Sequence, residues 1–595
     1  MLQRQLLSCS RASMRAISHP SHPTMMASCL KSSISQTSRS ISTSRLIYQE
    51  LKKTDPILKD TPVSTPNIAK TKTTTSSTPK KKGAGFWRWT FRITMFSTIA
   101  GWSALTYLVW KETNPADQLP QTELKPTGNK RKKVVIVGSG WGAMSFLQKL
   151  DTTQYNVVIV SPRNYFLFTP LLPSVPTGTI DQKSICDPVR LIARQTPGEV
   201  QYMEAAVTDI DPHAKKVYIE HKSDRLTIGD AFINDNEPIR AELDYDYLIY
   251  SVGAKVNTFG IQGIPEFASY LKEAQDAVAV RQKLFNSVEA ARLLPEGSDE
   301  RKRLMTFVVC GGGPTGVELA AEVKDYIVQD LSKFIPNLEN EMNVTLIEAL
   351  PNVLNMFHHK LIEYTQQVFN SQGVHLRTNT MVKKVDARNV YCTEKKADGS
   401  TEDHVIPYGT LVWAGGNAQR KVTTEFAAKI PEQTSRRGLL VDEYQKLYGV
   451  EDVYALGDCT FTKNPPTAQV ASQQGHFLAD HFNKLSKLDD LKFLANQEKQ
   501  PEQVEKLHKK IQRTESTLLP FHYEHQGSLA YIGSERAVAD LSFFQWSTVS
   551  VGGNLTFLFW RSAYVSMLMG VRNKVLVTTD WIKVAIFGRD CSKDN

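Results

Sequence analysis

The sequence predicts an α/β protein with two βαβ units in series, one apolar helix near the N-terminus and an amphipathic helical region at the C-terminus. Three observations support this class. Short runs of β-branched residues alternate with helical patterns, a glycine-rich turn follows a strand at two separate places, and 595 residues are too many for one hydrophobic core. With 41% hydrophobic and 22% charged residues, the composition predicts a folded, mostly soluble body.

The net charge of +10 is unevenly distributed along the chain. Residues 1–133 hold 22 Lys and Arg against 6 Asp and Glu, so by difference from the totals of 71 and 61 the rest holds 49 basic and 55 acidic side chains. The body is therefore mildly acidic, and a basic groove for nucleic acid is not expected on it. The seven cysteines form no CxxC or CxxxxC pair, which argues against an iron–sulfur cluster, a zinc ribbon or a dithiol centre, and no metal site is expected.

The N-terminal region is typical of a targeting sequence followed by a linker. Residues 1–48 lack Asp and Glu and carry arginines in a Ser-rich stretch, the composition of a mitochondrial transit peptide. A disordered basic tail is the alternative. Residues 49–85 are rich in Lys, Thr, Ser and Pro, and they predict a disordered linker that cannot bury a core.

Residues 86–111 predict one transmembrane helix. The apolar run within it has about 20 residues, which as a helix is roughly 30 Å long and matches a hydrocarbon core, and aromatic residues lie at both edges. A buried helix of a soluble domain is the alternative, because the core of the run is short for a span. Basic residues precede the helix and mostly acidic ones follow it, so the positive-inside rule places the body in the intermembrane space.

The first βαβ unit begins with the buried strand 132–137. The turn after it consists of Gly138, Ser139, Gly140, Trp141, Gly142 and Ala143. Gly138 permits a tight turn, Gly140 lets the backbone approach a pyrophosphate, and the small Ala143 lets helix and strand pack closely. The second strand, 157–160, ends in Ser161-Pro162-Arg163 without the usual acidic residue, so Ser161 or Arg163 is expected to contact the adenosine end.

The second βαβ unit begins with the strand 305–310. Its turn consists of Gly311, Gly312, Gly313, Pro314, Thr315 and Gly316, and Glu318 lies in the helix that it opens. The strand 344–347 ends on Glu348, which can accept hydrogen bonds from both adenine-ribose hydroxyls and would repel a 2′-phosphate, so NADH is favoured over NADPH. An ordinary strand-end glutamate is the alternative. Because Glu348 lies 32 residues after Gly316, we expect a longer linking helix than usual.

Two such units imply one tightly bound and one exchanging dinucleotide. A later strand ends in Gly457-Asp458, where flavoproteins of this architecture bind the ribitol of FAD, and the strands that end near Gly253 and Gly416 return between the domains. The sequence therefore predicts two nested Rossmann-type dinucleotide-binding domains, one for FAD and one for NADH. The expected segments are 131–255 and 421–482 for FAD, 256–420 for NADH, 483–520 as a helical insertion and 521–595 as a C-terminal membrane-anchoring domain.

From about Lys132 onward the sequence resembles the fungal type II (alternative) NADH:ubiquinone oxidoreductases of mitochondria, and with its leader and single span it resembles the external members. The matching segments include GSGWGA at 138–143, GGGPTGVELAAE at 311–322, ALGDC at 455–459 and PPTAQVASQQG at 465–475. The resemblance implies hydride transfer from NADH to FAD and electron delivery to ubiquinone at the inner membrane, without proton pumping. A matrix-facing internal enzyme and an NADH-binding flavoprotein like apoptosis-inducing factor are the alternatives.

The resemblance also implies roles for particular residues. Glu318 matches a carboxylate beside nicotinamide and flavin, and Ala468, Gln469 and Gln473 match the AQxxxQ motif against which quinone docks. Glu318, Gln469 and Gln473 are thus the expected catalytic residues, and Ala468 is also expected at the flavin. Tyr564 and Met567 match positions that line the quinone tunnel. Two positions depart from the family: Ser472 stands where His is frequent, and Gly415 where Thr is usual.

The C-terminal region predicts contact with a membrane. Between residues 555 and 587, apolar residues recur every three to four positions and basic residues lie on the opposite faces, which suits an amphipathic helix pair in the headgroup layer. A pair of core-packing helices is the alternative. The Lys- and Glu-rich stretch 483–516 predicts an exposed helical insertion with a solvated face, and homodimer contacts through it are the alternative.

Overall fold

The computed structural model describes residues 84–221, 227–228, 231–232, 238–541 and 549–592. The expected transit peptide and nearly all of the expected linker lie outside these residues. Helix α3 covers Ala84–Thr113 and so includes the predicted span 86–111. Its segment Phe91–Thr113 is long and apolar enough to cross a membrane, and the protein buries 0% of its apolar window. A core helix would be buried, so this exposure disfavours the soluble alternative.

The first dinucleotide domain is built on a five-stranded parallel sheet in the order β22-β11-β1-β2-β5. Its strands are β1 (Lys133–Val137), β2 (Asn156–Val160), β5 (Val200–Met203), β11 (Tyr247–Tyr250) and β22 (Val453–Ala455). They are apolar on both faces, because helices such as α4 (Trp141–Lys149) and α14 (Ala468–Gln497) cover one face, and the antiparallel strands 206–211, 216–221 and 239–244 cover the other together with helix 421–428. Helices α4 and α14 pack closely. A Cβ at Gly475 would lie 2.4 Å from the Gly142 carbonyl oxygen, so this crossing requires glycine.

The second domain is inserted into the first and repeats its pattern, with the sheet order β13-β20-β14-β15-β16. The elements are β13 (Ser269–Tyr270), α7 (Ala274–Arg292), α8 (Asp299–Leu304), β14 (Thr306–Cys310), α9 (Pro314–Tyr326), β15 (Asn343–Ile347), α12 (His359–Gln372), β16 (Val374–Arg377) and β20 (Thr410–Trp413). The longer linking helix expected between the turn and Glu348 is confirmed. Helix α9, the π-helix η3 (Ile327–Leu331) and α10 (Ser332–Phe334) follow one another without a break, and α11 (Leu338–Glu341) comes before β15.

The chain passes between the two domains twice, and the two connecting segments lie side by side. Strands β12 (Ala254–Val256) and β21 (Asn417–Gln419) form a two-stranded antiparallel sheet, and the predicted boundaries near 255 and 420 fall at this pair. Gly253 and Gly416 adopt φ angles of +66° and +43°, which turn the chain just before each strand. The long strands expected at 250–254 and 411–416 are shorter, since β11 ends at Tyr250 and β20 at Trp413.

Smaller elements complete the two domains. They are β3 (Tyr165–Leu167), η1 (Thr169–Ser174), η2 (Gln182–Ile185), β4 (Cys186–Pro188), α5 (Val189–Arg194), β6 (Ala206–Asp211), β7 (Lys216–His221), β8 (Thr227–Ile228), β9 (Ala231–Phe232), β10 (Ile239–Asp244), α6 (Ile264–Phe267), β17 (Thr380–Val385), β18 (Asn389–Lys395), β19 (Thr401–Pro407) and α13 (Lys421–Ala428). The strands β10-β7-β6 and β17-β18-β19 form one antiparallel sheet on each domain.

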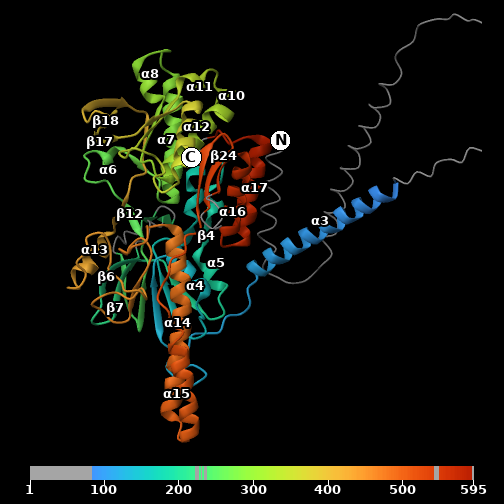
Figure 1. Cartoon of the computed structure of the whole chain (residues 1–595), viewed down its shortest axis with the longest axis vertical. Coiled ribbons are helices and arrows are strands. Elements are labelled where there is room, and N and C mark those ends of the chain that lie inside the picture. The colour runs from blue at the N-terminus through green and yellow to red at the C-terminus, as the bar shows by residue number, and fades with distance from the viewer. Residues whose placement is uncertain (1–83, 222–226, 229–230, 233–237, 542–548, 593–595) are drawn as a thin grey trace, which may run out of the picture. The chain divides into compact units, whose positions relative to one another are not determined.

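The predicted insertion is an extension of a domain helix. The expected boundary between residues 482 and 483 falls inside α14, which continues to Gln497 and pairs with α15 (Pro501–Glu515). Figure 1 shows α14 and α15 following one another along this extension. The FAD domain and the insertion therefore share one continuous helix.

The C-terminal region consists of a three-stranded sheet and two helices, so the predicted helix pair is confirmed. Strands β23 (Ser528–Gly533), β24 (Arg536–Leu541) and β25 (Val549–Gly553) are followed by α16 (Asn554–Met567) and α17 (Val571–Phe587), which lie beside β24 (Figure 1). Each helix has two apolar faces. Trp560, Tyr564 and Trp581 are buried against the body, whereas Leu558, Phe559, Ile582, Ile586 and Phe587 are exposed.

Candidate active site

A cavity of about 1020 Å³ lies between the second dinucleotide turn and the Gly457-Asp458 turn that follows β22 of the first domain. Gly313, Pro314 and Thr315 of the second turn line it together with Gly457 and Asp458 of the first domain. Its volume matches the upper range of cofactor pockets. The sequence had predicted that these five residues belong to two neighbouring cofactor sites, and the fold brings them to one cavity.

The first turn has the geometry that a pyrophosphate requires. Gly138 has φ +112°, and a Cβ there would lie 2.3 Å from the Ser251 carbonyl oxygen, so only glycine fits. A Cβ at Gly140 would meet no atom within 4 Å, which leaves room for a ligand over the start of α4. The residues present therefore fit FAD.

The side chains expected at the adenosine end contact protein groups. Ser139 and Ser161 share a hydrogen bond of 2.9 Å between their hydroxyls, which fixes the turn to the end of β2. Arg163 donates to Glu273 at 2.5 Å, and Glu273 begins α7 of the second domain. Arg163 thus joins the two domains beside the site.

The ribitol end is marked by Asp458 and by a residue that the sequence reasoning missed. Asp458 accepts a hydrogen bond from Asn417 Nδ2 at 3.3 Å, and Lys272 Nζ lies 3.8 Å from its carboxylate. Gln474 lines the cavity, accepts from Gly457 N at 2.8 Å and leaves its buried Nε2 without a protein partner. An unpaired buried donor in a cavity indicates a ligand acceptor, and its place next to Gln473 in the motif was the available signal.

The second turn places Glu348 where the sequence predicted it. The carboxylate of Glu348 accepts from Gly312 N at 2.5 Å and from Leu350 N at 2.8 Å, so it is held over the turn. A Cβ at Gly316 would lie 1.9 Å from the Gly311 carbonyl oxygen, so the helix start packs directly on the turn. A Cβ at Gly313 would meet open space, as a dinucleotide requires.

Glu318 lies on the side of α9 that faces the C-terminal sheet. It is 5% exposed, accepts from Tyr531 N at 3.1 Å and is not among the residues that line the cavity. Burial, with a smaller contribution from the charge of Glu322, raises the pKa of Glu318 to about 8, and the Tyr531 backbone N–H and Trp560 partly oppose this shift. At neutral pH the carboxyl is therefore mostly protonated and can donate a proton.

The motif residues of α14 face the segment that leads into β23. Gln469 Oε1 accepts from the Tyr523 hydroxyl at 2.5 Å, and Gln473 pairs with the backbone N–H and carbonyl of Glu524. Ala468 is the first residue of α14. Ser472 bonds Ser145 of α4 through their hydroxyls at 2.9 Å, so it serves helix packing.

The residues expected along the quinone tunnel differ in exposure. Tyr564 is buried, donates to the Leu529 carbonyl at 3.4 Å and lies 4.8 Å from Trp560 between ring centroids. Met567 is 43% exposed near the end of the same helix. Gly415 lies against the ring of Trp413, and a Cβ there would approach that ring to 3.0 Å. A threonine at this position would need the indole to move.

Comparisons with known proteins agree with this geometry. The sequence pattern of the pyridine nucleotide-disulphide oxidoreductases matches residues 132–475, and that of the NDH2 C-terminal domain matches residues 525–590. An external alternative NADH-ubiquinone oxidoreductase of Yarrowia lipolytica is 48% identical over 87% of this chain and 89% of its own. An external NADH-ubiquinone oxidoreductase of Saccharomyces cerevisiae is 46% identical over 86% and 92%. The structure of NDH2 from Plasmodium falciparum in complex with NADH superposes with a TM-score of 0.66 at 27% identity, covering 78% of this chain and 99% of that one.

Proposed function

Because the chain belongs to the mitochondrial alternative NADH-ubiquinone oxidoreductases, we propose that it oxidises NADH on the intermembrane-space side of the inner membrane. Its activity is FAD-dependent NADH:ubiquinone oxidoreduction without proton pumping. The observation that carries this assignment is the cavity shared by the second dinucleotide turn and the Gly457-Asp458 turn of the first domain, with a protonatable Glu318 behind it. The external orientation is supported by the basic residues before α3 and the mostly acidic ones after it.

Each side of the site has a defined task. FAD, when bound, accepts a hydride from NADH and passes the electrons to ubiquinone. Glu348 binds the adenine-ribose hydroxyls of NADH, Gln474 donates its free N–H group to the flavin side, and Asp458 holds the ribitol with Asn417 and Lys272. Glu318 supplies a proton to the quinone from the side of the C-terminal domain.

The membrane meets the protein at α16 and α17. Their exposed apolar residues form a face suited to the headgroup layer, and the buried Tyr564 connects this face to Glu318. A ubiquinone that enters between them would reach the proton donor without leaving an apolar environment. Gln469, Gln473 and Met567 lie at the border of this route. A homodimer stays a prediction, for which the α14–α15 extension is the surface to test.

The first test is oxidation of added NADH by intact mitochondria with and without this chain, while the proton-pumping enzyme is inhibited. NADH does not cross the inner membrane, so activity that depends on the chain and needs no permeabilisation supports the external orientation. Activity only after permeabilisation would contradict it. The flavoprotein alternative is tested with purified protein: reoxidation of the NADH-reduced flavin by a short-chain quinone within a second is expected, and slow reoxidation would favour a binding role.

A further inference from the structure

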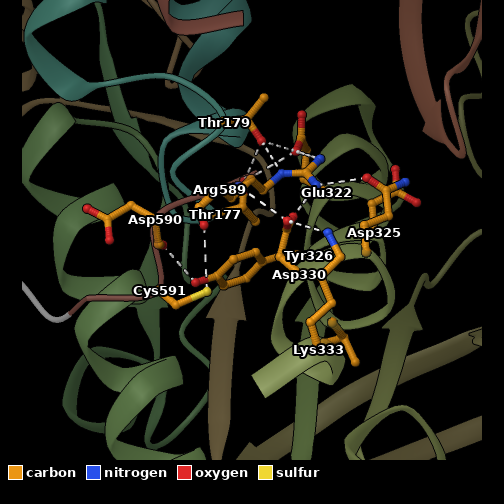
Figure 2. A network of polar contacts seen from close by, with 12 residues as sticks. Thr177, Thr179, Glu322, Asp325, Tyr326, Asp330, Lys333, Arg589, Asp590 and Cys591 are labelled. Atoms are coloured by element: carbon orange, nitrogen blue, oxygen red, sulfur yellow. Dashed lines mark hydrogen bonds and ion pairs between the residues drawn. The ribbon is translucent and has the colours of Figure 1, made fainter. Parts of the chain in front are cut away.

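A buried arginine after the last helix joins three parts of the molecule (Figure 2). Arg589 lies two residues beyond the end of α17 and is 9% exposed. Its Nε donates to Thr179 at 2.8 Å, one terminal nitrogen donates to Asp330 at 2.9 Å, and the other lies 3.5 Å from Glu322. One guanidinium thus connects the C-terminal tail to the FAD domain and to the helical segment that carries Glu318.

The carboxylate of Glu322 is the centre of this cluster. It accepts hydrogen bonds from Ser174 at 2.8 Å, Thr177 at 3.2 Å and Thr179 at 2.7 Å, and it is 3% exposed. Three hydroxyl donors and one guanidinium satisfy a buried charge that would otherwise be costly. In Figure 2, Glu322 and Thr179 both point toward the Arg589 head group.

Glu322 lies one helical turn after Glu318, on the same face of α9. The groups that face this pair come from several elements: Glu322 is faced by Arg589 of the tail and Arg561 of α16, and Glu318 by Tyr531 of β23 and by Trp560 and Tyr564 of α16. The charge of Glu322 acts on the proton affinity of Glu318. A positive group that compensates the charge of Glu322 therefore also influences the proton affinity of Glu318.

The backbone around Arg589 fits this connection closely. Gly588 ends α17 with φ +77°, and a Cβ there would lie 2.7 Å from the Asp330 carboxylate. The Arg589 backbone N–H donates to the same carboxylate at 3.3 Å, and the Tyr326 hydroxyl donates to the Asp590 carbonyl at 2.9 Å. The end of the membrane-facing helix α17 is thus fixed to α9 and η3.

We propose that Arg589 is a positioning residue for quinone reduction, which acts through Glu322 to hold Glu318 in place and to balance the charge beside it. The inference rests on the proposed function. Arg589 lies two residues beyond the end of α17. It therefore also fixes the membrane-facing helices relative to Glu318. Loss of Arg589 affects the quinone step and leaves the NADH step unchanged, because the cavity for the dinucleotides lies away from this cluster.

The test measures the two half-reactions separately in Arg589→Met, Arg589→Lys and the wild type, each purified with its flavin. In Arg589→Met, flavin reduction by NADH stays within about twofold, while flavin reoxidation by a short-chain quinone slows about tenfold or more. Arg589→Lys recovers part of this loss, because it restores the charge but not the three-way contact. Lys333→Gln is the matched control, since Lys333 contacts Asp330 at 3.5 Å from the exposed side.

The pH dependence separates a positioning role from a merely structural one. Quinone reduction needs protonated Glu318, so its rate falls as pH rises through the pKa of Glu318, about 8. Glu322→Gln removes a negative neighbour and moves this fall to lower pH, whereas Arg589→Met leaves that neighbour uncompensated and moves it to higher pH. Shifts in opposite directions support the proposal. Unchanged pH profiles, shifts in the same direction, or equal slowing of both half-reactions would overturn the proposal. A wild-type protein that reduces no quinone would instead overturn the proposed function.

Discussion

At the residue scale, some predicted site residues form the turns and the strand end that the dinucleotide-binding pattern requires, and others bind protein groups. Gly138, Gly140 and Glu348 lie as their spacing predicted, because a strand, a turn and a helix N-terminus leave little freedom. Ser161, Arg163 and Gln473, whose ligand contacts stay predictions, also bind protein groups that the sequence did not indicate. Spacing along the chain cannot reveal such partners, since they come from distant elements.

Replacing Glu348 by Gln tests the choice of nucleotide. The carboxylate repels a 2′-phosphate, and the amide does not, so the preference for NADH over NADPH falls by about tenfold, or roughly 1.4 kcal/mol. The measurement is kcat/KM for both nucleotides with one quinone. Because Glu348 also holds Gly312 N, Glu348→Asp is the control that keeps the charge. Unchanged selectivity in Glu348→Gln would show that another residue reads the ribose.

Replacing Gln469 by Ala tests the quinone side. Gln469 Oε1 accepts from the Tyr523 hydroxyl and from Gln526 N, so the substitution loosens the segment that leads into β23 and Glu318. Flavin reoxidation by quinone therefore slows more than flavin reduction by NADH, by about tenfold. Rapid mixing resolves the two steps, and Ser472→Ala is the control in the same helix. Equal slowing of both steps would remove Gln469 from the quinone route.

At the element scale, sequence periodicity located most helices and strands. It did not locate irregular turns within a helix or the places where a helix continues beyond its domain. The longer helix expected after Gly316 contains a π-helix that periodicity did not predict, and there Asp330 turns toward the tail. The insertion proved to be continuous with α14 because nothing in a helical pattern marks where it leaves a domain. The π-helix contacts the C-terminal tail, and the α14 extension contacts Lys125 and Lys132, so both features depend on residues that are distant in sequence.

Two carboxyl groups at the start of α17 lead to a prediction about how stability depends on pH. The carboxylate of Glu112 accepts from Val571 N and Arg572 N, and Asp187 lies beside it. Burial, and then Glu112, raise the pKa of Asp187 from 3.8 to about 6. Folded protein binds this proton more tightly than unfolded protein, so the stability that protonation provides is complete below about pH 4 and is lost as pH rises through 6.

Asp187→Asn removes that loss. At pH 7.5 the variant should have a higher thermal midpoint than the wild type, and its free energy of unfolding should be larger by on the order of 2 kcal/mol. Both differences should shrink toward pH 4. The exposed Asp244→Asn is the control and should change neither value. A gain that is the same at both pH values would mean that the charge of Asp187 is not the cause.

At the scale of the whole molecule, α3 and the exposed apolar face of α16 and α17 are two separate surfaces for the proposed contact with a membrane. The apolar window of α3 is unburied, and exposed side chains on the second face include Phe559 and Phe587. A chain that begins at Lys111 keeps Glu112 at the α17 joint and should still sediment with liposomes, because each buried phenylalanine contributes about 1.5–3 kcal/mol. Adding Phe559→Ser and Phe587→Ser should release the truncated chain, whereas in the full-length chain the same substitutions should leave it bound through α3. A truncated chain found entirely in the supernatant would mean that the C-terminal face is not a membrane surface, and quinone would have to reach Glu318 by another route.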